Sequence, residues 1–502
     1  MDTALYKRVL FVLFVLFVIA NGAYLHRVPG LLGDEASEGE NVFELLDKKQ
    51  ITVLGERSYI GPAIDYLRVP FVLLFGYSAL ALRTVMFLFS VATFWLTAVV
   101  LRRLFGRELS LFMLAFMAFS PAYLLYQRLG WTITLFPFFA FLTLFFLTSS
   151  FKNAPLLAGF SAGLGLANHI IFLPTLAGVF AAAVLYKLLG LFGKSVAVWM
   201  RSVLIWWPMA IGVLAGFGMQ FVVLILFRED QGSPVAVADS VGERWAALPY
   251  VLPLVLSGSS YVARYTGIEF APSLILGITG ALTVFSALGV LLVLIALLLL
   301  RHRIVSEEQK AEQVRTLCAA LAWVVGLAVH LVVLFYVIDR FTLRYFVVFV
   351  LGVWALAGLG IGFISLWLLR RTPQWLAAIP VASVVLLSVW MLWAVLIPFL
   401  TSGGSTNDFS LGNRTDSAAA FVDAQQLIAC LRGAGTVFSE NVHIWNRLRY
   451  VSHRHSDLEI LLEEEARRAR WLVHYRLPMD TAPIADRCPE LRHFRIQAVV
   501  QQ

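Results

Sequence analysis

Several carboxylates follow the first long apolar run of the chain, in the sequence GDEASEGENVFELL (33–46). A carboxylate within hydrogen-bond reach of a hydroxyl can accept its proton during nucleophilic attack. The same group can cap a helix, because Asp accepts hydrogen bonds from N–H groups of the first turn. Both roles are open for Asp34, since the apolar spacing behind it predicts an amphipathic helix with Asp34 at or just before its N-terminus. That spacing is set by Gly39, Val42, Phe43 and Leu46.

Cationic side chains at the ends of apolar runs are the second group that could do chemistry. Arginine binds phosphate through its planar fork of donors, and an ionisable group at membrane depth is a functional-site candidate by default. Other roles remain open: snorkelling to the interface for Arg128, an ion pair with Asp339 for Arg340, and packing for His169. The candidates are Arg128, His169, Arg264, Arg340 and Arg344, with Tyr345 beside the last of them.

The elements that must position these residues are membrane helices. Of the 502 residues 60% are hydrophobic and 14% charged, and the mean hydropathy is +0.81. Soluble domains carry about 25% charged residues. The apolar residues fall in runs of about 18–25, the length that a helix needs to cross a bilayer. The sequence therefore predicts a polytopic α-helical membrane protein of about eleven transmembrane helices. We place them at 9–26, 83–101, 109–124, 131–149, 154–171, 173–190, 203–227, 273–300, 316–337, 345–369 and 376–399.

Basic residues cluster in the short turns between apolar runs, which is typical of cytoplasmic loops. This placement predicts a cytoplasmic N-terminus and accounts for the formal net charge of +8 without a nucleic-acid partner. We interpret the first helix as an uncleaved anchor rather than a signal peptide, because its apolar stretch is long. The clusters are Lys7–Arg8, Arg102–Arg103–Arg107, Lys187–Lys194–Arg201, Arg301–Arg303 and Arg370–Arg371.

Three polar segments then lie outside: 27–82, 228–272 and the tail 400–502. Residues 64–74 of the first are too interrupted by polar residues to span and should lie along the interface. The tail predicts a small extracytoplasmic α/β domain, with helices at 418–431 and 458–470 and strands at 436–439 and 471–475. Cys430 and Cys488 both lie in this tail, where a disulfide is compatible with an extracytoplasmic location, and the sequence leaves their pairing open.

The run Asp34-Glu35-Ala36, followed by Gly39 and Glu40, resembles the first outer loop of the GT-C superfamily of membrane glycosyltransferases. This superfamily includes protein O-mannosyltransferases and the lipid A aminoarabinose transferase. The similarity covers 30–130 well and 330–365 loosely. It continues in Gly61–Pro62, Tyr66–Leu67, Phe75–Gly76, Leu82–Arg83, Leu104–Phe105–Gly106, Ser120–Pro121, Arg128 and Arg344–Tyr345.

The resemblance implies an inverting transfer of a sugar from a polyprenyl-phosphate donor to a lipid, glycan or protein acceptor on the outer face of the membrane. It implies residues 1–399 as the catalytic domain. The high ratio of Arg to Lys and the compact loops indicate a bacterial inner membrane, with the tail in the periplasm. Asp34 would be the general base, and Glu35 would orient the loop or bind acceptor. The expected substrate-binding residues are Glu35, Asp65, Arg128, His169, Arg264, Arg340, Arg344 and Tyr345.

The sequence also departs from the family. Gly61, Pro62 and Ala63 replace the lysine before paired prolines of the lipid A branch, and 122–132 contains no acid. A second carboxylate would come from Asp65 or Glu269. No His/Cys/Asp cluster has metal-ligand spacing, and a divalent ion on Asp34 is compatible with the sequence but not indicated. A transporter or flippase, or a non-catalytic assembly subunit for lipid-linked glycans, is the alternative. The apolar centres of the helices disfavour a transporter.

Overall fold

The computed structural model describes most of the helical part of the chain and several short segments of the tail. The described residues are 3–26, 31, 33–49, 60–190, 206–226, 241–259, 271–300, 307–337, 343–369, 428–433, 435–438, 449–450, 452–453, 458–460, 471–475 and 494–498.

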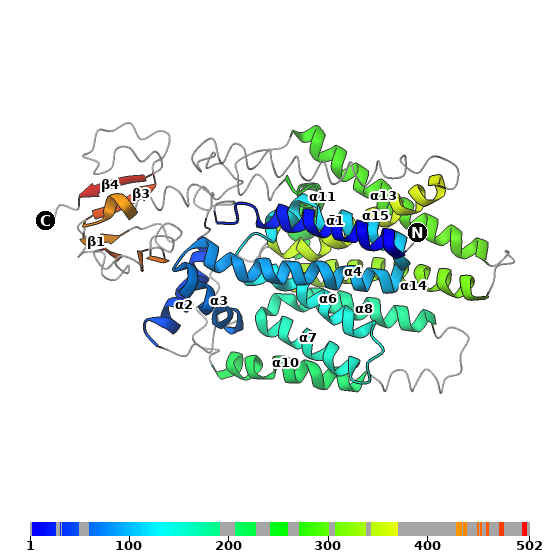
Figure 1. Ribbon diagram of the computed structural model, residues 1–502, viewed down its shortest axis with the longest axis horizontal. Coiled ribbons are helices and arrows are strands. Elements are labelled where there is room, and N and C mark those ends of the chain that lie inside the picture. The colour runs from blue at the N-terminus through cyan, green and yellow to red at the C-terminus, as the bar shows by residue number, and fades with distance from the viewer. Residues whose placement is uncertain are drawn as a thin grey trace.

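The described helices form one elongated bundle (Figure 1). Short helices lie between the long ones, as where Ser120 and Pro121 begin α5. The elements are α1 (Thr3–Gly22), α2 (Gly33–Leu46), α3 (Ala63–Phe75), α4 (Ala79–Ala118), α5 (Pro121–Tyr126), η1 (Thr132–Leu135), α6 (Phe136–Leu147), α7 (Ala154–Asn168), η2 (Ile170–Phe172), α8 (Leu173–Gly190), α10 (Trp207–Leu226), α11 (Val241–Leu256), α13 (Pro272–Leu300), α14 (Glu307–Val337), η3 (Leu343–Phe346) and α15 (Val347–Leu369).

Six described helices are long and apolar enough to cross a membrane by length and composition, and the chain is a multi-pass membrane protein. They are α1, α4, the η2–α8 pair, α13, α14 and α15. Each predicted span as far as 345–369 falls on a described helix, whereas 376–399 lies outside the described residues. The number of eleven therefore stays a prediction.

The chain reverses direction inside α4. Gly106 has φ 76°, a left-handed conformation that only glycine adopts without strain, so α4 consists of two legs. Gly130 lies against Leu82, near the start of the first leg. The chain therefore returns after the second leg to the end of the bundle at which α4 begins. This reversal confirms the turn predicted at the basic cluster Arg102–Arg103–Arg107. The predicted helix 109–124 is interrupted, since Ser120 and Pro121 end the second leg and begin α5.

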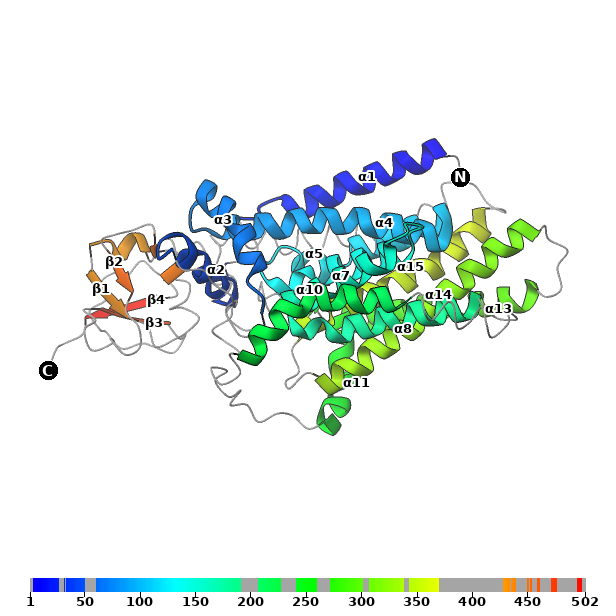
Figure 2. The ribbon, with the colours of Figure 1, turned by 90° about the horizontal axis from the view of Figure 1, so that it is seen from below.

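The two ends of the bundle differ in what they carry. Arg107 donates to the Thr3 hydroxyl (2.8 Å), so the Gly106 reversal lies beside the start of α1. Helices α2 and α3 lie at the other end, next to the small sheet (Figures 1 and 2). We call these the basic end and the α2 end. α15 lies at the centre, because 78% of its most apolar stretch is buried against 17% for α13.

A segment of the second polar loop contains a helix that the sequence did not predict. α11 contains Pro249 and Pro253, which obscure its pattern because proline breaks most helices. It packs into the bundle, where the Trp354 indole donates to the Leu256 carbonyl (3.0 Å).

The tail contains a four-stranded sheet with the order β2-β1-β3-β4. β1 (Gly435–Phe438) pairs in parallel with β2 (Leu458–Ile460) and β3 (Trp471–Tyr475), and β3 pairs antiparallel with β4 (Phe494–Ala498). Both predicted strands are present. The helix predicted at 458–470 is wrong at its start, because Leu458–Ile460 pairs in parallel with β1 and forms a strand. Cys430 is disulfide-bonded and Cys318 is free. The boundary at 400 stays a prediction.

Helices α7 and α10 pack through glycines at four-residue spacing. A Cβ on Gly212 would lie 2.1 Å from the Leu156 carbonyl oxygen, and one on Gly159 would lie 1.9 Å from that of Met209. Glycine at such positions lets two membrane helices approach closely. Gly218, further along α10, has nothing within 4 Å of an added Cβ.

We therefore expect Gly212→Ala to destabilise the protein and Gly218→Ala to leave its stability unchanged. The first change forces a methyl group into the α7 backbone, at a cost of about 1–3 kcal/mol. Thermal unfolding of both variants in the same detergent measures the difference. Equal melting temperatures would contradict the close packing of α7 on α10.

Candidate functional site

The carboxylate-rich run forms α2 as the apolar spacing predicts. Asp34 is the second residue of this helix, in its first turn, where the helix dipole favours a negative charge. The Asp34 side chain lies outside the described residues. Glu35 and Glu38 are one turn apart, so both can face the bundle, and both are buried.

Glu35 forms a buried ion pair with Arg83 at the start of α4. Arg83 donates from Nη2 to Oε2 (2.6 Å) and from Nε to Oε1 (2.9 Å), and its Nη1 donates to the Leu25 carbonyl (3.1 Å). Both side chains are fully buried. This two-point geometry fixes the first turn of α2 against the bundle. The ion pair is compatible with the loop-orienting role of Glu35, and the choice between this role and acceptor binding stays a prediction.

A second buried cluster lies one turn further along α2. Arg68 of α3 donates to Glu38 Oε2 (2.7 Å) and to Asp65 Oδ1 (2.8 Å). The other Asp65 oxygen accepts from Asn41 (3.0 Å). α2 and α3 are therefore joined by one guanidinium and two carboxylates. Asp65, predicted to bind substrate, has both oxygens engaged in this cluster.

Gly130 connects the two clusters. Its N–H donates to Glu35 Oε1, and its carbonyl accepts from Arg68. A Cβ on Gly130 would lie 3.1 Å from Glu35 Oε1 and from the Leu82 Cβ, so a side chain is poorly tolerated there. Thr132 continues the contact, since its hydroxyl lies 3.0 Å from Glu38 Oε1. The turn before η1 is thus clamped by α2 and α3.

Burial raises the pKa of both acids in the Arg68 cluster. The pKa of Glu38 lies above its usual range because it is desolvated, against the opposing effect of Arg68 and Thr132. Burial raises the pKa of Asp65 to about 7, with Arg68 opposing and Glu38 adding to the shift. Two carboxylates share one cation here, so the cluster favours retention of a proton near neutral pH.

Arg128 is buried rather than extended to the interface. It donates from Nη1 to the carbonyls of Ala20 (2.7 Å) and Asn21 (2.9 Å), and from Nη2 to that of Ala23. These are carbonyls at the C-terminal end of α1, which lack helical donors. Burial, together with the nearby Arg83, lowers the pKa of Arg128 to about 9. The cation joins α1 to the same turn that α2 clamps.

His169 and Tyr345 come together, from segments far apart in the sequence. His169 is buried between α7 and η2, and its Nδ1 accepts from the Ile171 N–H (3.2 Å). Its ring centroid is 6.3 Å from that of Tyr345 and 5.7 Å from that of Phe136. The neighbouring Asn168 donates to the Thr132 carbonyl (2.9 Å), which links this pair to the clamped turn.

The remaining predicted residues lie wholly or partly outside the described part of the chain. Arg264, Arg340 and Glu269 lie outside the described residues, and only the backbone of Arg344, in η3, is described. Among the described side chains there is no group of three or more His, Cys, Asp or Glu that could hold a metal ion. The Asp34 side chain is not among these described side chains, so the metal stays a prediction.

The sequence reasoning missed Glu38, Arg68 and the role of Gly130. Two signals could have found the first two. Glu35 and Glu38, like Asp65 and Arg68, are three residues apart and therefore on one helix face. Arg68 also interrupts an apolar run, where a charge needs a partner.

A segment of the tail docks on the exposed side of α2. Glu40 accepts from Arg449 Nε (2.9 Å), and both of its oxygens lie 3.0 Å from His453 Nε2. The His453 ring stacks on Phe43, and the Tyr450 hydroxyl donates to the Ser78 carbonyl (3.3 Å). α2 therefore lies between the bundle and the tail.

The raised pKa of Asp65 predicts a pH dependence of stability. Since its pKa is about 7 in the folded protein and 3.8 ordinarily, the folded state binds the proton more tightly between these values. Stability from this group is full below pH 4 and is lost as the pH rises through 7. Asp65→Asn cannot ionise, so we expect its stability relative to wild type to rise from pH 5 to pH 8. Melting temperatures of the variant and of wild type across this range measure the change, with Glu44→Gln, at a half-buried acid that pairs with Lys48, as the control. A constant difference would contradict the shift, for which one pKa unit corresponds to about 1.4 kcal/mol.

The Glu40 contacts predict that this side chain holds the tail segment. Glu40→Gln removes the charge that Arg449 and His453 share, which should weaken docking by about 1.5–3 kcal/mol. Hydrogen exchange of the peptide containing Tyr450 and Ser452 should then become faster. Glu44→Gln, one turn further along the same helix and paired with Lys48, should leave the exchange unchanged. Equal effects of both variants would exclude a specific role of Glu40 in docking the tail segment.

Comparisons with known proteins address the whole chain. No protein-family model and no curated protein sequence matches it. Among solved structures, ArnT from Cupriavidus metallidurans bound to undecaprenyl phosphate is similar, with a TM-score of 0.53 and 14% identity over 92% of this chain and 87% of that one. The apo oligosaccharyltransferase of Archaeoglobus fulgidus has a TM-score of 0.51 and 12% identity over 94% and 70%.

Both similar structures are GT-C superfamily membrane glycosyltransferases. The apo state of the Cupriavidus protein is similar as well, with a TM-score of 0.50 and 12% identity over 89% of this chain and 84% of that one. The chain therefore has the GT-C fold, and the resemblance drawn from its sequence motifs is confirmed at the level of the fold.

Proposed function

We propose that the chain is an inverting glycosyltransferase that moves a sugar from a polyprenyl-phosphate donor to a lipid, glycan or protein acceptor. The observation that carries this proposal is the position of Asp34. It begins a helix that follows the first span directly and that the Glu35–Arg83 pair fixes against α4. Similarity to ArnT bound to undecaprenyl phosphate supports the kind of donor.

The chemistry assigns Asp34 as the general base. An acceptor hydroxyl must lose its proton as it attacks the anomeric carbon, while the bond to the lipid phosphate breaks on the opposite side. A rigid support is needed, because catalysis depends on placing the base within about half an ångström of its working position. Glu35, which follows Asp34 in the sequence, supplies that support through its contacts with Arg83 and Gly130.

The departing phosphate carries negative charge that cations must meet. Arg128 is occupied by carbonyls of α1, which favours a structural part for it. We assign the phosphate to Arg344, at η3 beside the buried Tyr345, with Arg264 and Arg340 as further candidates. His169, adjacent to Tyr345, would line the same region.

We infer from the basic turns that the α2 end faces the outer side of a bacterial inner membrane, with the tail in the periplasm. The tail segment on Glu40 then covers the side of α2 that faces away from the bundle. This arrangement supports a role for the tail in positioning the acceptor over α2.

Asp34→Asn tests the proposal. We expect the purified variant to consume a polyprenyl-phosphate sugar about 10²–10⁴-fold more slowly than wild type, the usual contribution of a general base. The assay uses a panel of such donors with a membrane extract as the source of acceptor. Asp34→Glu, which keeps the carboxylate, should retain more activity than Asp34→Asn.

Melting temperatures separate catalysis from folding. Asp34→Asn should melt within a few degrees of wild type, and Glu44→Gln should match wild type in both assays. Full activity of Asp34→Asn would show that Asp34 is not the general base and only stabilises the start of α2. A wild-type protein that consumes no donor would contradict the enzymatic proposal and favour the transporter alternative.

A further inference from the structure

A cavity of about 780 Å³ opens at the basic end of the bundle, opposite α2. It lies between α4, α6, α8 and α14. Its volume is within the range of about 300–1,000 Å³ that is common for small-molecule sites. None of the residues that carry the proposed reaction lines it.

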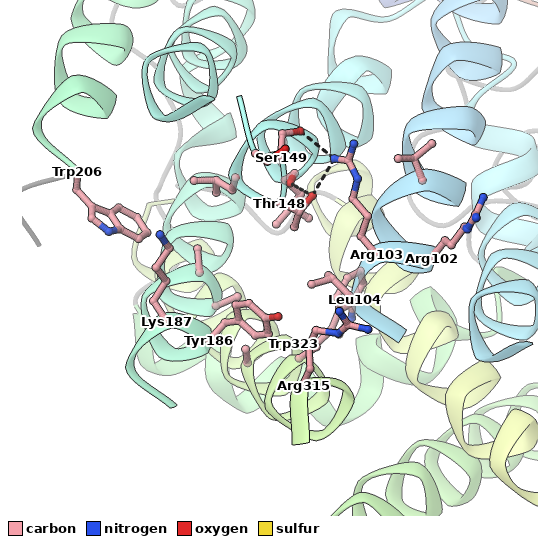
Figure 3. A pocket seen from close by; sticks show the side chains of 18 residues that line it. Arg102, Arg103, Leu104, Thr148, Ser149, Tyr186, Lys187, Trp206, Arg315 and Trp323 are labelled. Carbon is pink, nitrogen blue, oxygen red and sulfur yellow. Dashed lines mark hydrogen bonds between the residues drawn. The ribbon is translucent and has the colours of Figure 1, made fainter. Parts of the chain in front are cut away.

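The mouth of the cavity is cationic. Arg103, Lys187 and Arg315 face it from three different helices, as Figure 3 shows. Arg103 is oriented by the end of α6, where its Nη1 donates to the Ser149 hydroxyl (2.8 Å) and to the Phe145 carbonyl (3.0 Å). Among the described residues that line the cavity there is no carboxylate. The mouth therefore suits an anion.

The deeper wall is apolar. A smaller cavity of about 70 Å³ adjoins the first, and Leu144, Ala182 and Trp323 line both. It continues between α8 and α14, where Gly178 and Gly326 bring the two backbones together. Cationic groups at the mouth and apolar groups beyond it match an amphipathic molecule rather than a free anion.

We propose that this cavity binds an anionic phospholipid of the membrane leaflet at the basic end. Its phosphate lies among Arg103, Lys187 and Arg315, and part of an acyl chain enters the apolar extension. Basic pockets between membrane helices on the cytoplasmic side are known to bind anionic headgroups. The site is separate from the α2 end, so this proposal does not depend on the glycosyltransferase proposal.

Lys187→Met tests the site with little risk to folding. Lys187 is exposed, and its Nζ lies 6.0 Å from the centroid of the Trp206 ring, so methionine preserves most of the contact. Lys152→Met is the matched control. Lys152 is exposed in the turn between α6 and α7 at the same end of the bundle, but it does not line the cavity.

The measurement is native mass spectrometry of the full chain in detergent, titrated with phosphatidylglycerol or phosphatidylcholine. We expect wild type and Lys152→Met to bind phosphatidylglycerol equally and in preference to phosphatidylcholine. Lys187→Met should bind it about fivefold more weakly, the effect of one cation near a membrane surface. Lys187→Met together with Arg315→Met should weaken it further.

Three outcomes would overturn the proposal. If Lys187→Met and Lys152→Met weakened the binding of phosphatidylglycerol equally, the binding would depend on the overall charge of this face and not on the cavity. Equal binding of the two lipids would exclude recognition of an anionic headgroup. Displacement of phosphatidylglycerol by the same concentration of inorganic phosphate would show that phosphate alone is recognised and the acyl chain is not.

Discussion

The buried pair of Glu35 and Arg83 is the interaction on which the α2 end depends. Removing two charges from water is costly, and such a pair persists only when its geometry and further hydrogen bonds compensate. Here Arg83 also donates to Leu25, and Glu35 also accepts from Gly130. The pair therefore ties the exit of α1, the first turn of α2, the start of α4 and the turn before η1 to one another. Loss of either partner would leave an uncompensated buried charge, which typically costs about 3–5 kcal/mol.

The neighbouring cluster of Glu38, Arg68 and Asp65 extends the same constraint. Gly130 contacts both clusters, through its N–H on one side and its carbonyl on the other. A conformational change in either cluster must therefore move this peptide group or break its hydrogen bonds. Since Glu38 also contacts Thr132, and Asn168 donates to the Thr132 carbonyl, the constraint reaches the His169 and Tyr345 pair. Residues on which the proposed chemistry depends are thus supported by one connected polar network in an otherwise apolar bundle.

Periodicity and the placement of charges predicted a large part of this architecture. The apolar spacing of 33–46 gave α2, and the basic cluster Arg102–Arg103–Arg107 gave the turn at which α4 reverses. Pairings across long sequence separations could not be predicted, because helix spacing identifies a face but not its partner. Glu35 pairs with Arg83, which is 48 residues away in the sequence. Arg128 donates to the carbonyl of Ala20, which is 108 residues away. Leu458–Ile460 was assigned to a helix for a related reason, since a three-residue strand becomes visible only through its pairing with β1.

The two ends of the bundle differ in how their charged side chains are arranged. At the α2 end, carboxylates and arginines are buried together, so the charges compensate each other and rigidify the elements around Asp34. At the basic end, cations from three helices line a cavity, and the described residues that line it include no acid. Compensation from within the protein gives fixed geometry, which a catalytic carboxylate requires. A cationic cavity lining can attract an anionic headgroup, which is the property expected of a lipid site at the surface of a membrane.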